Sequence, residues 1–166
     1  AWAAVAIAGS LAFAADAGWI TAKAGLAQVL LERSWQRSEG IGDAQPPWPW
    51  ADTHPVARLR MPALGVDQFV LAGDSGRTLA FGPGWSQASA APGTRGLSVL
   101  SGHRDTHFAW LERLAPGDEL ELDTGDGLRR YRVETMEVVD SSTHRIGLDI
   151  GEDALALVTC WPFDAV

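Results

Sequence analysis

The fold of this chain is most constrained by a series of short apolar segments that begins at Val56 and is interrupted throughout by glycine, proline and aspartate. Most of these segments alternate apolar and polar residues, which is the two-residue period of a strand. We expect strands at residues 56–61, 68–72, 97–100, 119–123, 129–139 and 154–160, and one or two helical turns at residues 106–114. The turn Gly125-Asp126-Gly127 joins two strands as a hairpin. The sequence therefore predicts an all-β barrel or sandwich over residues 56–166.

An apolar segment, residues 1–22, precedes this domain and is just long enough to cross a bilayer. Trp2 and Trp19 stand near its two ends, as membrane-interface aromatic residues do. Asp16 is an objection, because a carboxylate at the centre of a bilayer is costly, but it lies toward one end of the segment. We therefore expect an N-terminal transmembrane helix. A cleaved signal peptide and a buried amphipathic helix are the competing interpretations.

Residues 23–55 are expected to connect the anchor to the barrel. Residues 23–36 can continue as a helix, because apolar residues recur there at roughly helical spacing. These residues are Leu26, Val29, Leu30 and Trp35. The stretch that follows is rich in proline and tryptophan, and proline favours extended neighbours. We interpret it as a semi-rigid spacer that packs on the domain or rests at the membrane interface.

The formal net charge of −8 argues against binding to nucleic acid or to an anionic surface. The carboxylates are scattered along the chain, without the dense cluster that a calcium site requires. A peptide or small-molecule partner is easier to reconcile with this charge. We expect no nucleic acid, no metal and no cofactor.

The chain has one cysteine, Cys160, at the end of the continuously apolar segment 154–160, which is typical of a strand buried on both faces. A lone cysteine is most often a small buried hydrophobic residue. Here, however, it stands where a strand leads into a proline-containing loop, and such positions present reactive groups. A thiol is a weak nucleophile at neutral pH because its unperturbed pKa is ~8.5, and a nearby imidazole can move its proton.

Two of the four histidines are candidates for that imidazole. His103 follows the expected strand 97–100 and Gly102, which lets the backbone approach closely, and His107 lies four residues further on. His54 and His144 lie in the spacer and in a polar turn. Two interpretations of the neighbouring Asp105 remain open: it orients an imidazole, or it caps the turn that follows.

Several motifs, in this order, resemble the sortase family from about residue 57 to the C-terminus. They are Ala57 to Val66, Leu79 to Gly84, Gly102-His103, Phe108 to Leu114 followed by Pro116-Gly117-Asp118, and Leu-x-Thr-Cys at Leu157 to Cys160. The apolar N-terminal segment and the Trp-Pro-Trp spacer resemble a proteobacterial, class GN-type branch of that family.

The resemblance implies a closed β-barrel of eight strands and a thiol transpeptidase that cleaves a C-terminal LPxTG-like sorting signal of a surface protein. Cys160 would form a thioacyl intermediate that an amine acceptor resolves, and His103 would move the protons. Gly102, Thr159 and Asp105 would orient these groups or contact substrate. The resemblance also implies a single-pass protein of the cell inner membrane, with the catalytic domain on the periplasmic side.

The sequence departs from the family at one important point. The family places an arginine on the strand after the cysteine, where it can donate to the developing oxyanion. None of the six residues after Cys160 is arginine. We expect this arginine and the eighth strand beyond Val166, with Arg104 and Arg145 as the substitutes within the chain.

Two other functions remain open on the residues alone. His103, His107 and Cys160 are ligands that zinc accepts, and together they could form a metal site. Alternatively, the chain is a non-enzymatic, membrane-tethered β domain that binds a peptide and carries an inert cysteine.

Overall fold

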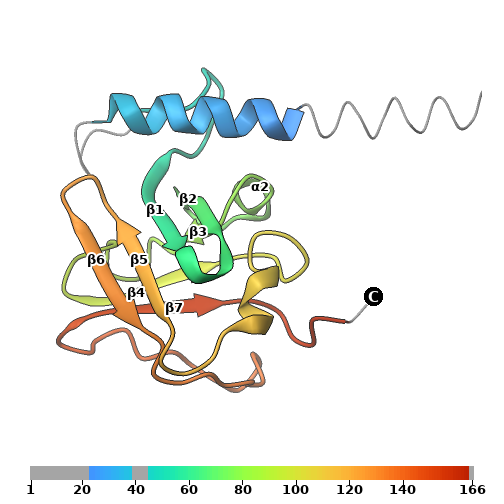
Figure 1. Ribbon diagram of the computed structural model, residues 1–166, viewed down its shortest axis with the longest axis vertical. Coiled ribbons are helices and arrows are strands. Elements are labelled where there is room, and N and C mark those ends of the chain that lie inside the picture. Colours follow the sequence, from blue (N-terminus) through green and yellow to red (C-terminus); the bar gives the residue numbers. More distant parts are fainter. Residues whose placement is uncertain (1–22, 39–44, 165–166) are drawn as a thin grey trace, which may run out of the picture.

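One curled sheet of seven strands forms the body of the molecule, with the strand order β6-β5-β1-β2-β3-β4-β7. The structure, a computed structural model, describes residues 23–38 and 45–164. The strands are β1 (Pro55–Met61), β2 (Val66–Ala72), β3 (Gly84–Trp85), β4 (Gly96–Ser101), β5 (Glu119–Asp123), β6 (Leu128–Arg132) and β7 (Asp153–Val158). Figure 1 shows that the sheet bends into a nearly closed barrel. The predicted all-β barrel is confirmed.

Short helical elements connect some of these strands. They are the 3₁₀ helices η1 (Pro62–Leu64) and η2 (Ala109–Arg113) and the single-turn helix α2 (Gly76–Leu79). The helical turns expected at residues 106–114 are therefore confirmed as η2. The predicted membrane anchor, residues 1–22, lies outside the described residues. Across residues 23–38 and 45–164, no helix combines the length and the apolar character needed to cross a bilayer.

The core lies inside the barrel, where β1 and β5 bury alternate side chains and β2 buries its last four. β1 pairs with β2 on one side and with β5 on the other, both antiparallel, and its side chains alternate between buried and half-buried along its second half. The side chains that are fully enclosed include Leu59, Met61, Val70, Leu100, Phe108 and Leu122. Burial of apolar area at this density is the main stabilising term of the domain.

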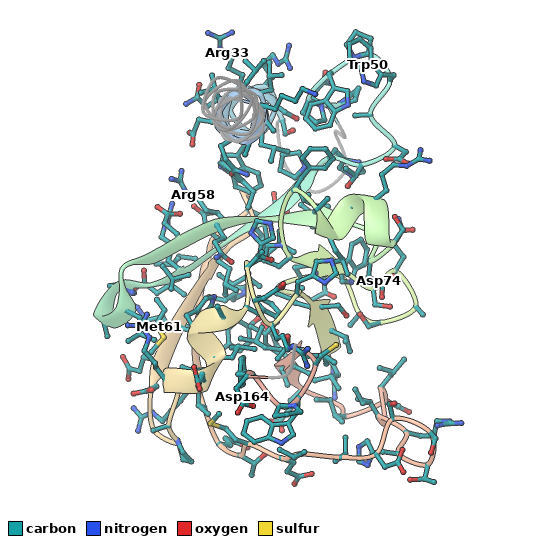
Figure 2. The ribbon with its side chains drawn as sticks, turned by 90° about the vertical axis from the view of Figure 1, so that its right-hand side faces the viewer. Arg33, Trp50, Arg58, Met61, Asp74 and Asp164 are labelled. Carbon is teal, nitrogen blue, oxygen red and sulfur yellow. The ribbon has the colours of Figure 1, made fainter. Side chains whose placement is uncertain are left out.

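A helix of residues 23–37, which we call the N-terminal helix, packs against the outside of β2 (Figures 1 and 2). Leu31 is fully buried in a cluster with Phe69 and Leu71. Arg58 on β1 reaches Glu32 of the helix at 3.3 Å and lies over the ring of Phe69, 5.1 Å from its centroid. The helix is therefore part of the folded domain.

The helix expected at residues 23–36 is confirmed, although only part of the apolar residues that indicated it are turned toward the barrel. The buried positions are Ala27, Leu31 and Ser34, whereas Leu26 is 58% exposed and Val29 is 48% exposed. Leu31 packs against Phe69 and Leu71, and the hydroxyl of Ser34 donates to the carbonyl of Gln45. Leu30 is half-buried, and Trp35 packs against Phe69, with the ring centroids 6.3 Å apart.

The described part of the spacer, residues 45–54, also packs on the domain. Trp48 meets Phe81 edge to face, with the ring centroids 5.1 Å apart. The hydroxyl of Thr53 is buried and donates to the carbonyl of Ala72 at 2.7 Å. Of the two placements expected for the spacer, packing on the domain is the one observed, although Trp50 is 83% exposed.

Two predicted strands were wrong in their bounds or burial. β6 ends at Arg132, and residues 133–152 run to β7 without regular strand pairing, although residues 133–139 alternate in sequence. β7 ends at Val158 and is half-buried rather than buried on both faces, because β4 is its only partner strand among the described residues.

β6 and β7 are the two ends of the strand order, and side chains join them. The hydroxyl of Tyr131 on β6 donates to Asp153 on β7 at 2.7 Å, and Arg129 lies 3.6 Å from the same carboxylate. Burial, together with the hydrogen bond to Asp153, raises the pKa of Tyr131 well above its ordinary range, so the hydroxyl stays protonated as a donor. These contacts hold the barrel nearly closed.

We expect Tyr131→Phe to lower the free energy of unfolding by about 1 kcal/mol, because one hydrogen bond to a carboxylate is lost and the ring is kept. Chemical denaturation of both proteins measures this difference. Arg130→Gln is the matched control, since Arg130 pairs with Glu121 within the β5–β6 hairpin and that contact is exposed. The control should change stability by about 0.5 kcal/mol or less. Equal effects of the two substitutions would contradict a closing role for Tyr131.

Candidate active site

β4 and β7 lie side by side and run in parallel, and they end together (Figure 1). Ser101, the last residue of β4, is paired with Val158, the last residue of β7. The hydrogen-bond ladder extends one step further, because the N–H of Gly102 donates to the carbonyl of Val158 at 3.1 Å. Parallel neighbours that end in register release their chains at one edge of the sheet. His103 and Cys160, two residues past these strand ends, therefore start from neighbouring backbone positions.

Gly102 can only be glycine in this arrangement. A Cβ atom at this position would stand 2.7 Å from the ring of Phe108, which is completely buried. The N–H of Phe108 in turn donates to the carbonyl of His103 at 2.9 Å, which closes a tight turn over residues 103–108. The buried ring thus forces the backbone before His103 into close contact with the core.

Two side-chain hydrogen bonds join the segment that carries His103 to the segment that carries Cys160. The hydroxyl of Thr159 donates to the carbonyl of Gly102 at 2.8 Å, and the guanidinium of Arg104 donates to the carbonyl of Pro162 at 2.8 Å. Thr159 directly precedes Cys160 in the sequence, and Pro162 follows it by two residues. The two loops are therefore linked both before and after the cysteine.

We expect Thr159→Val to lower the free energy of unfolding by about 0.5–1.5 kcal/mol and to lower activity several-fold, because the carbonyl of Gly102 loses its donor. Thermal denaturation and steady-state kinetics measure the two effects. Thr159→Ser, which keeps the hydroxyl, is the control and should retain most of both. If Val and Ser behave alike, the hydrogen bond does not position the loop.

Cys160 and His103 are both exposed. This excludes the common alternative in which a lone cysteine is a small buried core residue. Reactive cysteines sit where a substrate can reach the sulfur, whereas structural cysteines are enclosed. The exposed thiol at a braced strand end has the placement that a nucleophile requires.

His107, the second candidate imidazole, is held in a different way. Its carbonyl accepts hydrogen bonds from Gln68 at 2.9 Å and from the indole of Trp110 at 2.8 Å. Burial lowers the pKa of His107, an effect only partly offset by its hydrogen bond to the carbonyl of Ala80, and the nearby charge of His103 lowers the pKa further. His107 is therefore anchored to the barrel, while His103 faces solvent.

The remaining candidate residues have clear positions. Asp105 is exposed in the turn after His103. Arg145 donates to the carbonyls of Ser142 and His144, within its own loop. Within residues 23–38 and 45–164, no three histidine, cysteine or acidic side chains gather closely enough to hold a metal ion. The zinc site of His103, His107 and Cys160 that the sequence left open is thus not assembled.

Gln68 and Trp110, which hold the carbonyl of His107, were not found from the sequence. Gln68 lies 39 positions before His107, on β2, which β3 separates from β4 in the strand order. Its polar side chain directly precedes the apolar run 69–72, which is the sequence signal that could have drawn attention to it.

The chain is a nearly closed β-barrel in which a histidine and an exposed cysteine follow the ends of two parallel strands. A family model described as "Sortase domain" matches residues 59–166, and the chain therefore belongs to the sortase family. The branch within the family stays a prediction.

Individual relatives agree with this assignment. The chain is 34% identical over 109 residues to Sortase D of Bacillus subtilis (strain 168), an alignment that covers 65% of this chain and 55% of that protein. The chain thus spans about half the length of this curated relative. The crystal structure of sortase C-1 from Actinomyces oris is 29% identical, covers 68% of each chain and has a TM-score of 0.57. Sortase A from Corynebacterium diphtheriae has a TM-score of 0.64 at 21% identity over 83% of this chain and 78% of its own, which shows the shared fold.

Proposed function

We propose that this chain is a cysteine transpeptidase in which Cys160 is the nucleophile and His103 is the general acid and base. The observation that carries the proposal is the register of β4 and β7, which ends both strands together and brings the two residues to one edge of the sheet. The exposure of both side chains and the bracing of their loops support it. Membership of the sortase family supports the same reaction class.

In the first half-reaction, the thiolate of Cys160 attacks the carbonyl carbon of the scissile peptide bond. A C–S bond forms, the C–N bond breaks, and protonated His103 gives its proton to the departing amine. The product is a thioester on Cys160. Splitting one difficult acyl transfer into two steps in this way is the general advantage of a covalent nucleophile.

In the second half-reaction, an incoming amine attacks the thioester carbonyl and gives up a proton to neutral His103. The new C–N bond forms, the C–S bond breaks, and Cys160 leaves as the thiolate beside protonated His103, which is the state that began the cycle. The thioester keeps most of the free energy of the original peptide bond, so re-ligation needs no other energy source. Water can take the place of the amine, in which case the outcome is hydrolysis.

The proposed substrate is an LPxTG-like sorting signal at the C-terminus of a surface protein, with an amine of a second molecule as acceptor. We also propose that residues 1–22 anchor the protein in the inner membrane, with the barrel on the periplasmic side. The apolar character of this segment supports the anchor. Both proposals extend to this chain what the sortase family suggests.

Incubation of the full-length protein with a library of LPxTG-like peptides, with and without an added amine, tests the reaction. Mass spectrometry of the products should show cleavage between Thr and Gly and, with the amine present, a new amide on the Thr carbonyl. Cys160→Ala is the control for contaminating proteases. A complete protein that binds these peptides but never cleaves them would instead support the non-enzymatic peptide-binding domain.

A further inference from the structure

The N-terminal helix turns one face away from the barrel, and that face combines apolar and basic side chains. Leu26 and Val29 are both exposed. Arg33 is exposed too, and it shares their face because residues three, four and seven positions apart lie on one side of an α-helix. Figure 2 looks along the helix and shows Arg33 on its outer side. The face opposite the buried Ala27 and Leu31 is therefore both apolar and cationic.

This helix is basic although the whole chain is acidic. Residues 23–38 hold Lys23, Arg33 and Arg37 against the single acidic residue Glu32, whereas the full sequence has 13 basic and 21 acidic residues. The carboxylate of Glu32 is taken up by the barrel, where it pairs with Arg58 of β1 at 3.3 Å. The net charge of −8 disfavours an anionic partner for the molecule as a whole, but it does not describe this face.

Trp50 adds a second apolar group on the same side of the molecule. It is more exposed than any other large apolar side chain in the described part of the chain. Its loop is nevertheless well held, because Trp48 packs on Phe81 and its carbonyl accepts the N–H of Ala51 at 3.0 Å. Figure 2 shows Trp50 and Arg33 at one end of the molecule, both pointing away from the barrel. An exposed indole beside apolar and basic side chains is typical of proteins at a membrane–water interface.

We propose that Leu26, Val29, Arg33 and Trp50 form a docking surface for a bilayer that contains anionic phospholipid. The apolar side chains enter the boundary between headgroups and acyl chains, and the guanidinium of Arg33 binds lipid phosphate. The apolar residues 1–22 lead directly into the helix at residue 23, so the same bilayer would hold both. That last argument rests on the proposed anchor, whereas the apolar and cationic composition of the face does not.

Docking of this surface gives the barrel one orientation on the bilayer. The helix packs on β2, and β3 and β4 separate β2 from β7 in the strand order. Figure 1 shows the helix and β7 on opposite sides of the barrel. The strand end that carries Cys160 therefore lies away from the bilayer and open to the aqueous side.

The full-length chain, reconstituted in lipid vesicles, tests the docking surface through an environment-sensitive fluorophore on a single cysteine. In the Cys160→Ala background, the label is placed at Leu26→Cys or, as a control, at Val138→Cys, which is exposed on the 133–152 loop. In vesicles with phosphatidylglycerol, the label at position 26 should emit at shorter wavelength. It should also be quenched by aqueous acrylamide about threefold less than the label at position 138. The protein lacks its cysteine nucleophile, so the outcome is independent of the proposed reaction.

Substitutions separate docking from simple tethering. Arg33→Gln combined with Arg37→Gln should remove the difference in protection between vesicles with phosphatidylglycerol and vesicles of phosphatidylcholine alone. Arg113→Gln combined with Arg130→Gln, which changes the charge equally on η2 and β6, should not. Trp50→Ser should lower the protection in both kinds of vesicle, because the indole no longer enters the interface.

Three results would overturn the proposal. Equal quenching at positions 26 and 138 would show that the barrel is held clear of the bilayer, and a chain that does not float with either kind of vesicle does not bind lipid. Protection that survives both the arginine substitutions and Trp50→Ser would assign the contact to residues 1–22 alone. Protection in detergent micelles that rises with protein concentration would instead assign the surface to a second copy of the chain.

Discussion

Cys160→Ala is expected to reduce peptide cleavage to the level without enzyme, and His103→Ala is expected to lower kcat/KM by about 10²–10⁴-fold. The two differ because the thiol forms the covalent intermediate, whereas the imidazole only moves protons that water can move slowly. The register of β4 and β7 places both residues at one edge of the sheet, so their removal should leave the fold intact. Steady-state kinetics with a quenched fluorescent peptide measures both effects.

His144→Ala is the matched control, because His144 is exposed in the loop before β7 and has no role in the proposed reaction. It should retain wild-type kcat/KM. His107→Ala separates the two imidazoles further: it should lower stability through lost packing, with a smaller effect on kcat than His103→Ala. If His107→Ala proved the more damaging to kcat, the roles of the two histidines would have to be exchanged.

Gly102→Ala is expected to lower the free energy of unfolding by about 1–3 kcal/mol, although it adds a single methyl group. That methyl would stand 2.7 Å from the ring of Phe108, and the ring cannot retreat because it is fully buried. Either the ring or the backbone before His103 must move. Because the hydroxyl of Thr159 donates to the carbonyl of Gly102, we also expect activity to fall about tenfold or more with the displacement.

The control for this substitution is Gly147→Ala, where a Cβ atom meets nothing within 4 Å and stability should be nearly unchanged. A double mutant tests the proposed cause. Phe108→Leu alone creates a cavity and destabilises the core, but combined with Gly102→Ala it should cost less than the sum of the single substitutions, because the smaller side chain relieves the clash. Strict additivity of the two would show that the ring is not what requires glycine at position 102.

The strands that could be predicted are those whose sequence carries a clear alternation or a clear apolar run. β1 and β5 alternate in burial, whereas β2 and β4 each bury a run of consecutive residues, and all four predicted ranges match the structure within two residues at each end. β3 has only two residues, Gly84–Trp85, and no periodicity can mark it. Its place depends on packing, because a Cβ atom on Gly84 would stand 2.3 Å from the carbonyl of Gly73.

The expectations for β6 and β7 failed for a related reason. Alternation continues in sequence past Arg132, but no partner strand among the described residues continues beside it, and pairing ends there. The apolar run of β7 predicted burial on both faces, whereas β7 stands at one end of the strand order and is half-buried. The sequence pattern indicates which side chains of a strand are apolar enough to be buried. Whether they are buried depends on the strands and loops that pack beside them.

Part of the candidate site could be read from the sequence, because it follows from strand ends. His103 was predicted just past one strand and Cys160 at the end of another, and the parallel pairing of those strands brings them to one edge, although β7 ends two residues before Cys160. Gln68 could not be found this way. Its role depends on a contact between β2 and the turn after His103 that only the folded barrel creates.

Intact-protein mass spectrometry of the full-length chain, mixed with an LPxTG-like peptide and sampled before turnover is complete, tests the central claim most directly. We expect a species heavier by the acyl fragment of the peptide, with the added mass located on Cys160 by fragmentation. The species should disappear on addition of an amine or hydroxylamine, as a thioester does. The contradicting result is cleavage of the peptide without any acyl species on Cys160, both in the wild type and in His103→Ala. That result would exclude a covalent mechanism at Cys160.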